Sequence, residues 1–139
     1  MLRIPTAVDR YIFHPIEAAV ALLIYGLFKI LPIDLASALG GWLGRTIGPR
    51  MPISERAVRN LSAAFPEKTP AEIGAIVRGM WDNLCRVVAE YPHLGEINVY
   101  DAQGRVEASG GETVDLLRED GHEGIFFSAH IANWELASI

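Results

Sequence analysis

The sequence predicts a mixed α/β fold, with membrane-associated helices first (residues 1–50) and the start of an α/β domain after them (residues 51–139). Two observations lead to this class. Residues 16–31 form a long apolar stretch, and after Pro92 the helical spacing of apolar residues gives way to short apolar runs between glycine turns. A helix, a turn and then a buried strand is the order typical of an α/β domain.

Composition and charge agree with this division. Half of the residues are hydrophobic and 21% are charged, which excludes an intrinsically disordered chain. Residues 1–60 carry seven basic and four acidic side chains, whereas residues 61–139 carry five and thirteen. This asymmetry indicates a membrane-facing end joined to a cytosolic body, although chance segregation on a soluble surface gives the same counts. No basic patch with interleaved aromatic residues is present, so nucleic acid is not expected as a partner.

The apolar stretch at residues 16–31 is predicted to attach the chain to a membrane. From Ala18 to Phe28 it contains no charged residue. A span needs about 20 apolar residues, so the stretch is slightly short. Glu17 and Lys29 lie at its ends, where long side chains reach lipid headgroups. We expect a short transmembrane helix or an interfacial helix rather than a buried core helix, and the flanking charges do not fix its orientation.

A second apolar helix is expected from Ile33 to Ile47, after the break at Pro32. Gly40, Gly44 and Gly48 recur along it at four-residue spacing. Such a stripe of small residues allows two helices to approach closely, and ordinary loop glycines are the alternative.

The best-specified element is a helix that begins at Thr69 and ends before Pro92. Thr69 and Glu72 have the spacing of a capping box, with proline in the first turn. Apolar residues then recur every three or four positions, which predicts an amphipathic helix with Trp81 and Leu84 buried. The single cysteine, Cys85, lies among apolar neighbours and is expected to be a buried, inert thiol.

Short extended segments are expected beyond Pro92. They are Ile97–Tyr100, Arg105–Ala108 and Ile125–Phe127, and a short helix at Thr113–Glu119 lies between the last two. Ligands of α/β sheets bind beyond the carboxyl ends of the strands. His130 follows the last predicted strand, and it is therefore the first candidate for a site residue.

His130 and Glu135 form a candidate acid–base pair. A carboxylate that holds one ring nitrogen fixes the histidine tautomer and leaves the other nitrogen as a base. Five residues do not place two side chains on one face of a helix, so the pair requires a turn between them. Spacing alone favours a structural contact over a catalytic one. With one cysteine and no second ligand at metal spacing, no metal site is expected.

The residues around this pair carry a family resemblance. An apolar run, then Ser-Ala-His and Asn-Trp-Glu, resembles the H-x-x-x-x-[DE] motif of the bacterial lipid A lauroyl/myristoyl acyltransferase family, within the lysophospholipid acyltransferase-like superfamily. The resemblance covers nearly the whole chain. Its other motifs are Arg59-Asn60-Leu61, Ala64-Phe65-Pro66 and Gly79-Met80-Trp81-Asp82-Asn83-Leu84.

The resemblance implies an enzyme that moves a fatty acyl chain from an acyl carrier protein thioester to a hydroxyl of a lipid A precursor, in lipopolysaccharide biosynthesis. His130 would be the general base and Glu135 would orient it. Asn133 would bind substrate, with helix capping as the alternative. No cofactor is implied. The expected partners are acyl carrier protein, the lipid A precursor and membrane lipid, and the expected location is the bacterial inner membrane with the catalytic part facing the cytoplasm.

Members of this family continue past the motif, whereas this sequence stops at Ile139. We therefore expect an apparently truncated α/β domain, as a fragment or as a truncated gene product with little activity alone. Two other functions remain open. One is an acyltransferase for another glycolipid or a lysophospholipid, and the other is a membrane-associated interaction protein that docks through the amphipathic helix.

Overall fold

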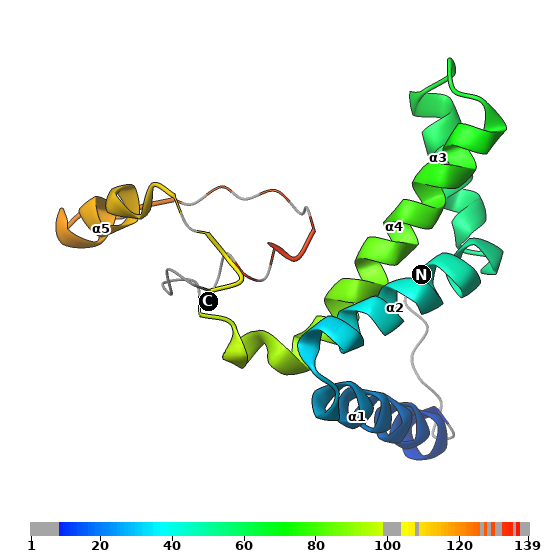
Figure 1. Cartoon of the computed structure of the whole chain (residues 1–139), viewed down its shortest axis with the longest axis horizontal. Helices are drawn as coiled ribbons and strands as arrows, with labels where there is room; N and C mark the ends of the chain where they lie inside the picture. The colour runs from blue at the N-terminus through cyan, green and yellow to red at the C-terminus, as the bar shows by residue number, and fades with distance from the viewer. Residues whose placement is uncertain are drawn as a thin grey trace. The chain divides into compact units, whose positions relative to one another are not determined.

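The structure is a computed structural model that describes residues 9–98, 104–107, 109–125, 127, 129, 132–134 and 136. The chain divides into two units, Met1–Pro92 and His93–Ile139. Every regular element in the described part is helical (Figure 1). The elements are a π-helix η1 (Asp9–Phe13), α1 (His14–Ile30), α2 (Ile33–Ile47), a 3₁₀-helix η2 (Gly48–Arg50), α3 (Ser54–Ala64), α4 (Pro70–Glu90), a 3₁₀-helix η3 (Tyr91–Glu96) and α5 (Gly111–Glu119).

The predicted α/β class is wrong. No strand occurs among the described residues, and Ile125 and Phe127 of the best strand candidate are 80% and 94% exposed. The described residues of 97–100 and 105–108 are likewise irregular. A strand requires a neighbouring strand to pair its backbone N–H and C=O groups and a layer to cover its apolar face. A short apolar run supplies neither, so its hydrophobicity alone was misleading. The helix expected near Thr113 is confirmed as α5.

Helix α1 is almost entirely exposed although it is apolar. Together with η1 it gives a segment, Tyr11–Ile30, that is long and apolar enough to cross a membrane by length and composition. A core helix of a soluble protein meets the same criteria, but such a helix is mostly buried, whereas 6% of this segment is buried. The helix ends where Leu31 turns extended before Pro32. The Nζ of Lys29 donates to the carbonyl of Pro92 at 2.8 Å, so this ammonium group is held by protein.

Helices α2 and α4 form the main contact of the first unit (Figure 1). Gly40, Gly44 and Gly48 are buried, which confirms the predicted stripe of small residues. A Cβ atom built on Gly40 would lie 2.5 Å from the carbonyl oxygen of Cys85, and one on Gly44 would collide with the carbonyl oxygen of Trp81. The two helices therefore meet backbone to backbone, at a separation that only glycine permits.

The capping box at the start of α4 is confirmed. The backbone N–H of Glu72 donates to the hydroxyl of Thr69 at 3.3 Å, and the backbone N–H of Thr69 donates to the Glu72 carboxylate at 2.7 Å. The bond from the Thr69 backbone N–H, together with one that the Thr69 hydroxyl donates to the same carboxylate at 2.8 Å, favours the charged form and holds the pKa of Glu72 below its ordinary value. The helix then runs unbroken through Gly79 to Glu90.

The predicted burial on α4 is only partly right. Ile73, Val77 and Ala89 are buried and Trp81 is partly buried, but Leu84 is 47% exposed. The glycine contact selects the face of α4 that carries Trp81, Cys85 and Ala89. Leu84 lies about 100° around the helix from Cys85, so the apolar surface of α4 is wider than the surface that α2 covers.

We expect Gly44→Ala to lower the free energy of unfolding by about 1–3 kcal/mol, because the new methyl group overpacks the α2–α4 contact. The matched control is Gly79→Ala, where a Cβ meets nothing within 4 Å. That change should stabilise α4 by about 1 kcal/mol, since alanine is the better helix former. Thermal unfolding in detergent micelles, followed by circular dichroism, measures both. Equal stability of the two variants would contradict the close contact.

Candidate functional site

The predicted catalytic residues, His130 and Glu135, lie outside the described residues, as does Ser128. Between them the structure describes Ala132, Asn133 and Trp134. Ala132 has a φ of 50°, in the left-handed region that alanine rarely adopts. A regular helix does not run through this residue, which agrees with the turn that the five-residue spacing requires. Strained backbone of this kind clusters at functional sites.

Asn133 is partly buried in the turn that follows Ala132. Its carbonyl accepts a hydrogen bond from the backbone N–H of Leu136 at 3.2 Å, which closes a single short turn. The backbone of Asn133 is thus at the start of a helical turn, where both predicted roles, substrate binding and capping, remain open.

A different histidine–glutamate pair occurs in η3, where the Nδ1 atom of His93 lies 3.0 Å from the Oε2 atom of Glu96. The side chain of His93 is 3% exposed and that of Glu96 is 56% exposed. A ring buried to this extent is closed to a bulky lipid substrate, so the pair is structural. The pair was not predicted from the sequence, although its three-residue spacing is the signal of two side chains that meet on a helical turn.

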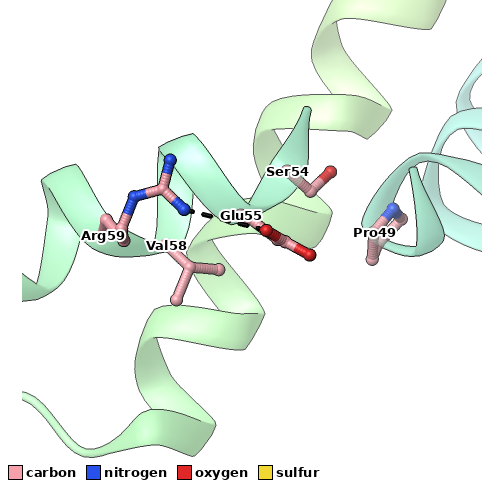
Figure 2. A pocket seen from close by; sticks show the side chains of 5 residues that line it. All are labelled: Pro49, Ser54, Glu55, Val58 and Arg59. Atoms are coloured by element: carbon pink, nitrogen blue, oxygen red, sulfur yellow. Dashed lines mark ion pairs between the residues drawn. The ribbon is translucent and has the colours of Figure 1, made fainter. Parts of the chain in front are cut away.

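A shallow pocket of about 340 Å³ lies between η2 and α3, and Pro49, Ser54, Glu55, Val58 and Arg59 line it (Figure 2). Arg59 and Glu55 face each other across one turn of α3 and form an ion pair of 3.7 Å. Both side chains are more than two-thirds exposed. An exposed pair of this type contributes about 0–1 kcal/mol and has no strong preference for a ligand.

The serine of this pocket is committed to structure. The hydroxyl of Ser54 donates to the carbonyl of Gly48 at 2.7 Å and accepts a hydrogen bond from the indole N–H of Trp81 at 2.7 Å. The Ser54 hydroxyl donates one of these bonds and accepts the other, and neither partner is a base that could activate its oxygen as a nucleophile. The pocket therefore has no nucleophile of the serine type.

An electrostatic network connects α2 to α4 beside the glycine contact. Asp82 forms ion pairs with Arg45 of α2 and, at 3.0 Å, with Arg86. Arg86 also donates to the hydroxyl of Ser37 at 3.3 Å. The hydrogen bond from Arg86, aided by the charges of both arginines, holds the pKa of Asp82 below its ordinary value. The Asp82–Arg86 spacing was visible in the sequence, whereas the Arg45 contact required the tertiary structure.

The segment Gly79–Leu84, one of the motifs that carried the family resemblance, therefore has a structural role. Trp81 packs against Gly48 and bonds to Ser54, and Asp82 binds the two arginines. These contacts join α2, η2, α3 and α4 into one unit.

Cys85 of α4 is partly buried beside Gly44 of α2. Burial, together with the nearby charge of Asp82, raises the pKa of the thiol. A raised pKa keeps the thiol neutral, which supports the inert role predicted for it. Among the described residues, no group of three or more histidine, cysteine or acidic side chains is placed to hold a metal ion.

We expect acid to weaken the α2–α4 contact through Asp82. Because the pKa of this carboxyl is lowered by folding, its stabilisation is present above the unfolded-state value of about 3.9 and is lost as the pH falls through the folded-state pKa. Asp82→Asn should lower the melting temperature at pH 7 and flatten its dependence on pH between 6 and 3. Asp115→Asn, which removes the exposed pair with Arg118, is the control and should change neither.

The comparisons with known proteins identify the family of the chain. A family model described as bacterial lipid A biosynthesis acyltransferase matches residues 7–139, which include His130 and Glu135. No curated protein and no solved structure matched the chain. The match covers nearly all of the sequence, and the chain belongs to the bacterial lipid A biosynthesis acyltransferase family.

Proposed function

We propose that this protein transfers a fatty acyl chain from an acyl carrier protein thioester to a hydroxyl of a lipid A precursor. Membership of the family supports an acyltransferase role in lipid A biosynthesis. The observation that carries the finer proposal is that the family match extends through the H-x-x-x-x-E segment, residues 130–135. Within that segment, the left-handed Ala132 supports a turn rather than a continuous helix.

The chemistry explains why a histidine and a carboxylate suffice. A thioester carbonyl is a good electrophile, whereas a lipid hydroxyl is a poor nucleophile at neutral pH. His130 removes the hydroxyl proton as the oxygen attacks the carbonyl carbon, and the tetrahedral intermediate then expels the carrier thiolate, which takes the proton. Glu135 accepts a hydrogen bond from the second ring nitrogen and stabilises the imidazolium. Such proton transfer contributes a factor of about 10²–10⁴ in rate.

Asn133 completes the proposed site as a substrate-binding residue. Asn133 lies within the motif, three residues after His130 in the sequence, and its partly buried position supports this proposal. An amide side chain offers both a donor and acceptors, and it therefore suits a substrate that carries hydroxyl and carbonyl groups.

The proposed location is the bacterial inner membrane, with the catalytic part on the cytoplasmic side. Members of the family are membrane-associated, and the exposed apolar segment Tyr11–Ile30 is the candidate anchor. A lipid acceptor and a protein-bound acyl donor meet at a membrane surface, so an anchored enzyme reaches both.

We expect His130→Ala and Glu135→Ala each to remove most of the activity, by a factor of at least about 10². The double variant should be little worse than the worse single one, because the two residues act as a unit. The assay is acyl transfer from acyl carrier protein to a lipid A precursor, with the protein as its gene encodes it. His122→Ala and Glu123→Ala, at exposed positions nearby, are matched controls and should retain activity.

Near wild-type rates for His130→Ala in folded protein would exclude the assignment. Transfer to a lysophospholipid or another glycolipid in place of the lipid A precursor would keep the mechanism and change the acceptor. If the unaltered protein transfers no acyl chain to any acceptor, and a stop codon directly follows the Ile139 codon in its gene, the alternative of a membrane-associated interaction protein would be favoured.

We further expect Leu22→Lys combined with Leu23→Lys to release the chain from membranes. Both side chains lie within Tyr11–Ile30 and are at least 70% exposed. A lysine in the centre of an apolar helix costs roughly 2.5–3.5 kcal/mol for insertion. Flotation with phospholipid vesicles measures the bound fraction, and Leu116→Lys on the exposed face of α5 is the control. Recovery of the unaltered chain as a monodisperse soluble species would refute the anchor.

A further inference from the structure

Helix α2 has two opposite apolar faces. One carries the buried small residues Ala36, Gly40 and Gly44, which contact α4 or the end of α1. The other, which we call the outer stripe, follows the spacing four, three, four and four along the helix. The outer stripe consists of Leu35, Leu39, Trp42 and Thr46 of α2, with Arg50 of η2 at its end. At 100° per residue the four positions within α2 lie on the side opposite the glycines.

The bulky side chains of the outer stripe are largely uncovered. Leu35 is 53% exposed and Trp42 is 54% exposed. Leu39 is the exception, because it packs against the cluster of Phe28, Ala36 and Ala89. An exposed tryptophan and leucine on one helix face form an apolar surface, and its removal from water is favourable in free energy.

The polar side chains of the outer stripe are bound to the helix itself. The hydroxyl of Thr46 donates to the carbonyl of Trp42 at 2.8 Å, and the guanidinium of Arg50 donates to the carbonyl of Thr46. A polar group without such a partner costs free energy when it leaves water. These bonds therefore reduce the cost of placing this face in an apolar medium.

Arg50 supplies the positive charge of the outer stripe. Arg45 also lies on α2, but its charge is compensated by the ion pair with Asp82. Arg50 has a long side chain whose charged end can reach headgroups while its stem lies along apolar surface. A surface with this charge is complementary to anionic phospholipids.

The outer stripe is continuous with the candidate membrane helix. Two residues, Leu31 and Pro32, separate the end of α1 from the start of α2, as Figure 1 shows. Phe28 in the last turn of α1 belongs to the cluster that Leu39 packs against. Lipid that covers the end of α1 would therefore also reach the outer stripe.

We propose that the outer stripe of α2 is a second membrane contact that lies in the interfacial region of an anionic phospholipid bilayer. Trp42 lies at the boundary between headgroups and acyl chains, which tryptophan prefers, and Arg50 binds lipid phosphate. A single anchoring helix leaves the attached protein free to rotate about the helix axis. A second contact removes this freedom and holds the α2–α4 unit in one orientation on the membrane.

The test is a nitroxide spin label at Leu35→Cys or at Trp42→Cys, in a Cys85→Ala background. Ala75→Cys, at an exposed position on α4, is the control. The labelled chain is bound to phosphatidylcholine vesicles with and without phosphatidylglycerol. Labels in the outer stripe should be more accessible to oxygen, which concentrates in the acyl region, than to a water-soluble nickel chelate. The control label should show the reverse.

Equal nickel accessibility at Trp42→Cys and Ala75→Cys would overturn the proposal. Dipolar broadening between labels at Trp42→Cys would also overturn it, because a second copy of the chain would then cover the stripe. Arg50→Gln should reduce the preference for phosphatidylglycerol about fivefold, and Arg78→Gln on α4 should leave it unchanged. These measurements use no acyl donor, so their failure is separate from a failure of the proposed acyl transfer.

Discussion

The backbone contact between α2 and α4 is the constraint on which the rest of the first unit depends. Gly40 and Gly44 let the two helices approach so closely that a Cβ atom at either position would collide with the backbone of α4. At that separation, side chains that flank the glycines on the two helices can also reach one another. Asp82 therefore reaches Arg45 across the contact, and Trp81 covers Gly48 while it bonds to Ser54. The Arg45–Asp82 ion pair and the indole hydrogen bond depend on the glycine packing, because each joins residues far apart in the sequence.

The first unit leaves most of its large apolar side chains exposed. Its described buried core is small and includes Phe28, Ala36, Ile73, Val77 and Ala89. Most large apolar side chains of α1 are exposed, as are those of the outer stripe of α2. A soluble protein rarely leaves contiguous surface of this kind in water. The proposed contact with lipid would account for both features, because lipid covers apolar helices without requiring a protein core.

The proposed chemistry and the best-defined packing lie in different units. The helical contact belongs to Met1–Pro92, whereas the His130–Glu135 motif belongs to His93–Ile139. The motif Gly79–Leu84 is as much a part of the family resemblance as the histidine motif, yet its side chains hold helices together. A family motif therefore identifies relatives without identifying which residues react. The roles proposed for His130 and Glu135 rest on the family resemblance and on their chemistry, while those of Trp81 and Asp82 rest on observed contacts.

Local signals in the sequence determined the helices of this protein. The Thr69–Glu72 capping box and the three-and-four spacing of α4 act within a few residues of chain, so they could be identified without a structure. The spacing of the α2 glycines was also visible in the sequence, although the helix that they contact was not. The exposed state of Leu84, the pairing of Arg45 with Asp82 and the absence of strands from the described residues could not. Each of these depends on a partner distant in sequence. A strand needs another strand, and a buried face needs a covering layer. The hydrophobic pattern indicates which side chains favour burial, and only the tertiary structure decides which of them another element covers.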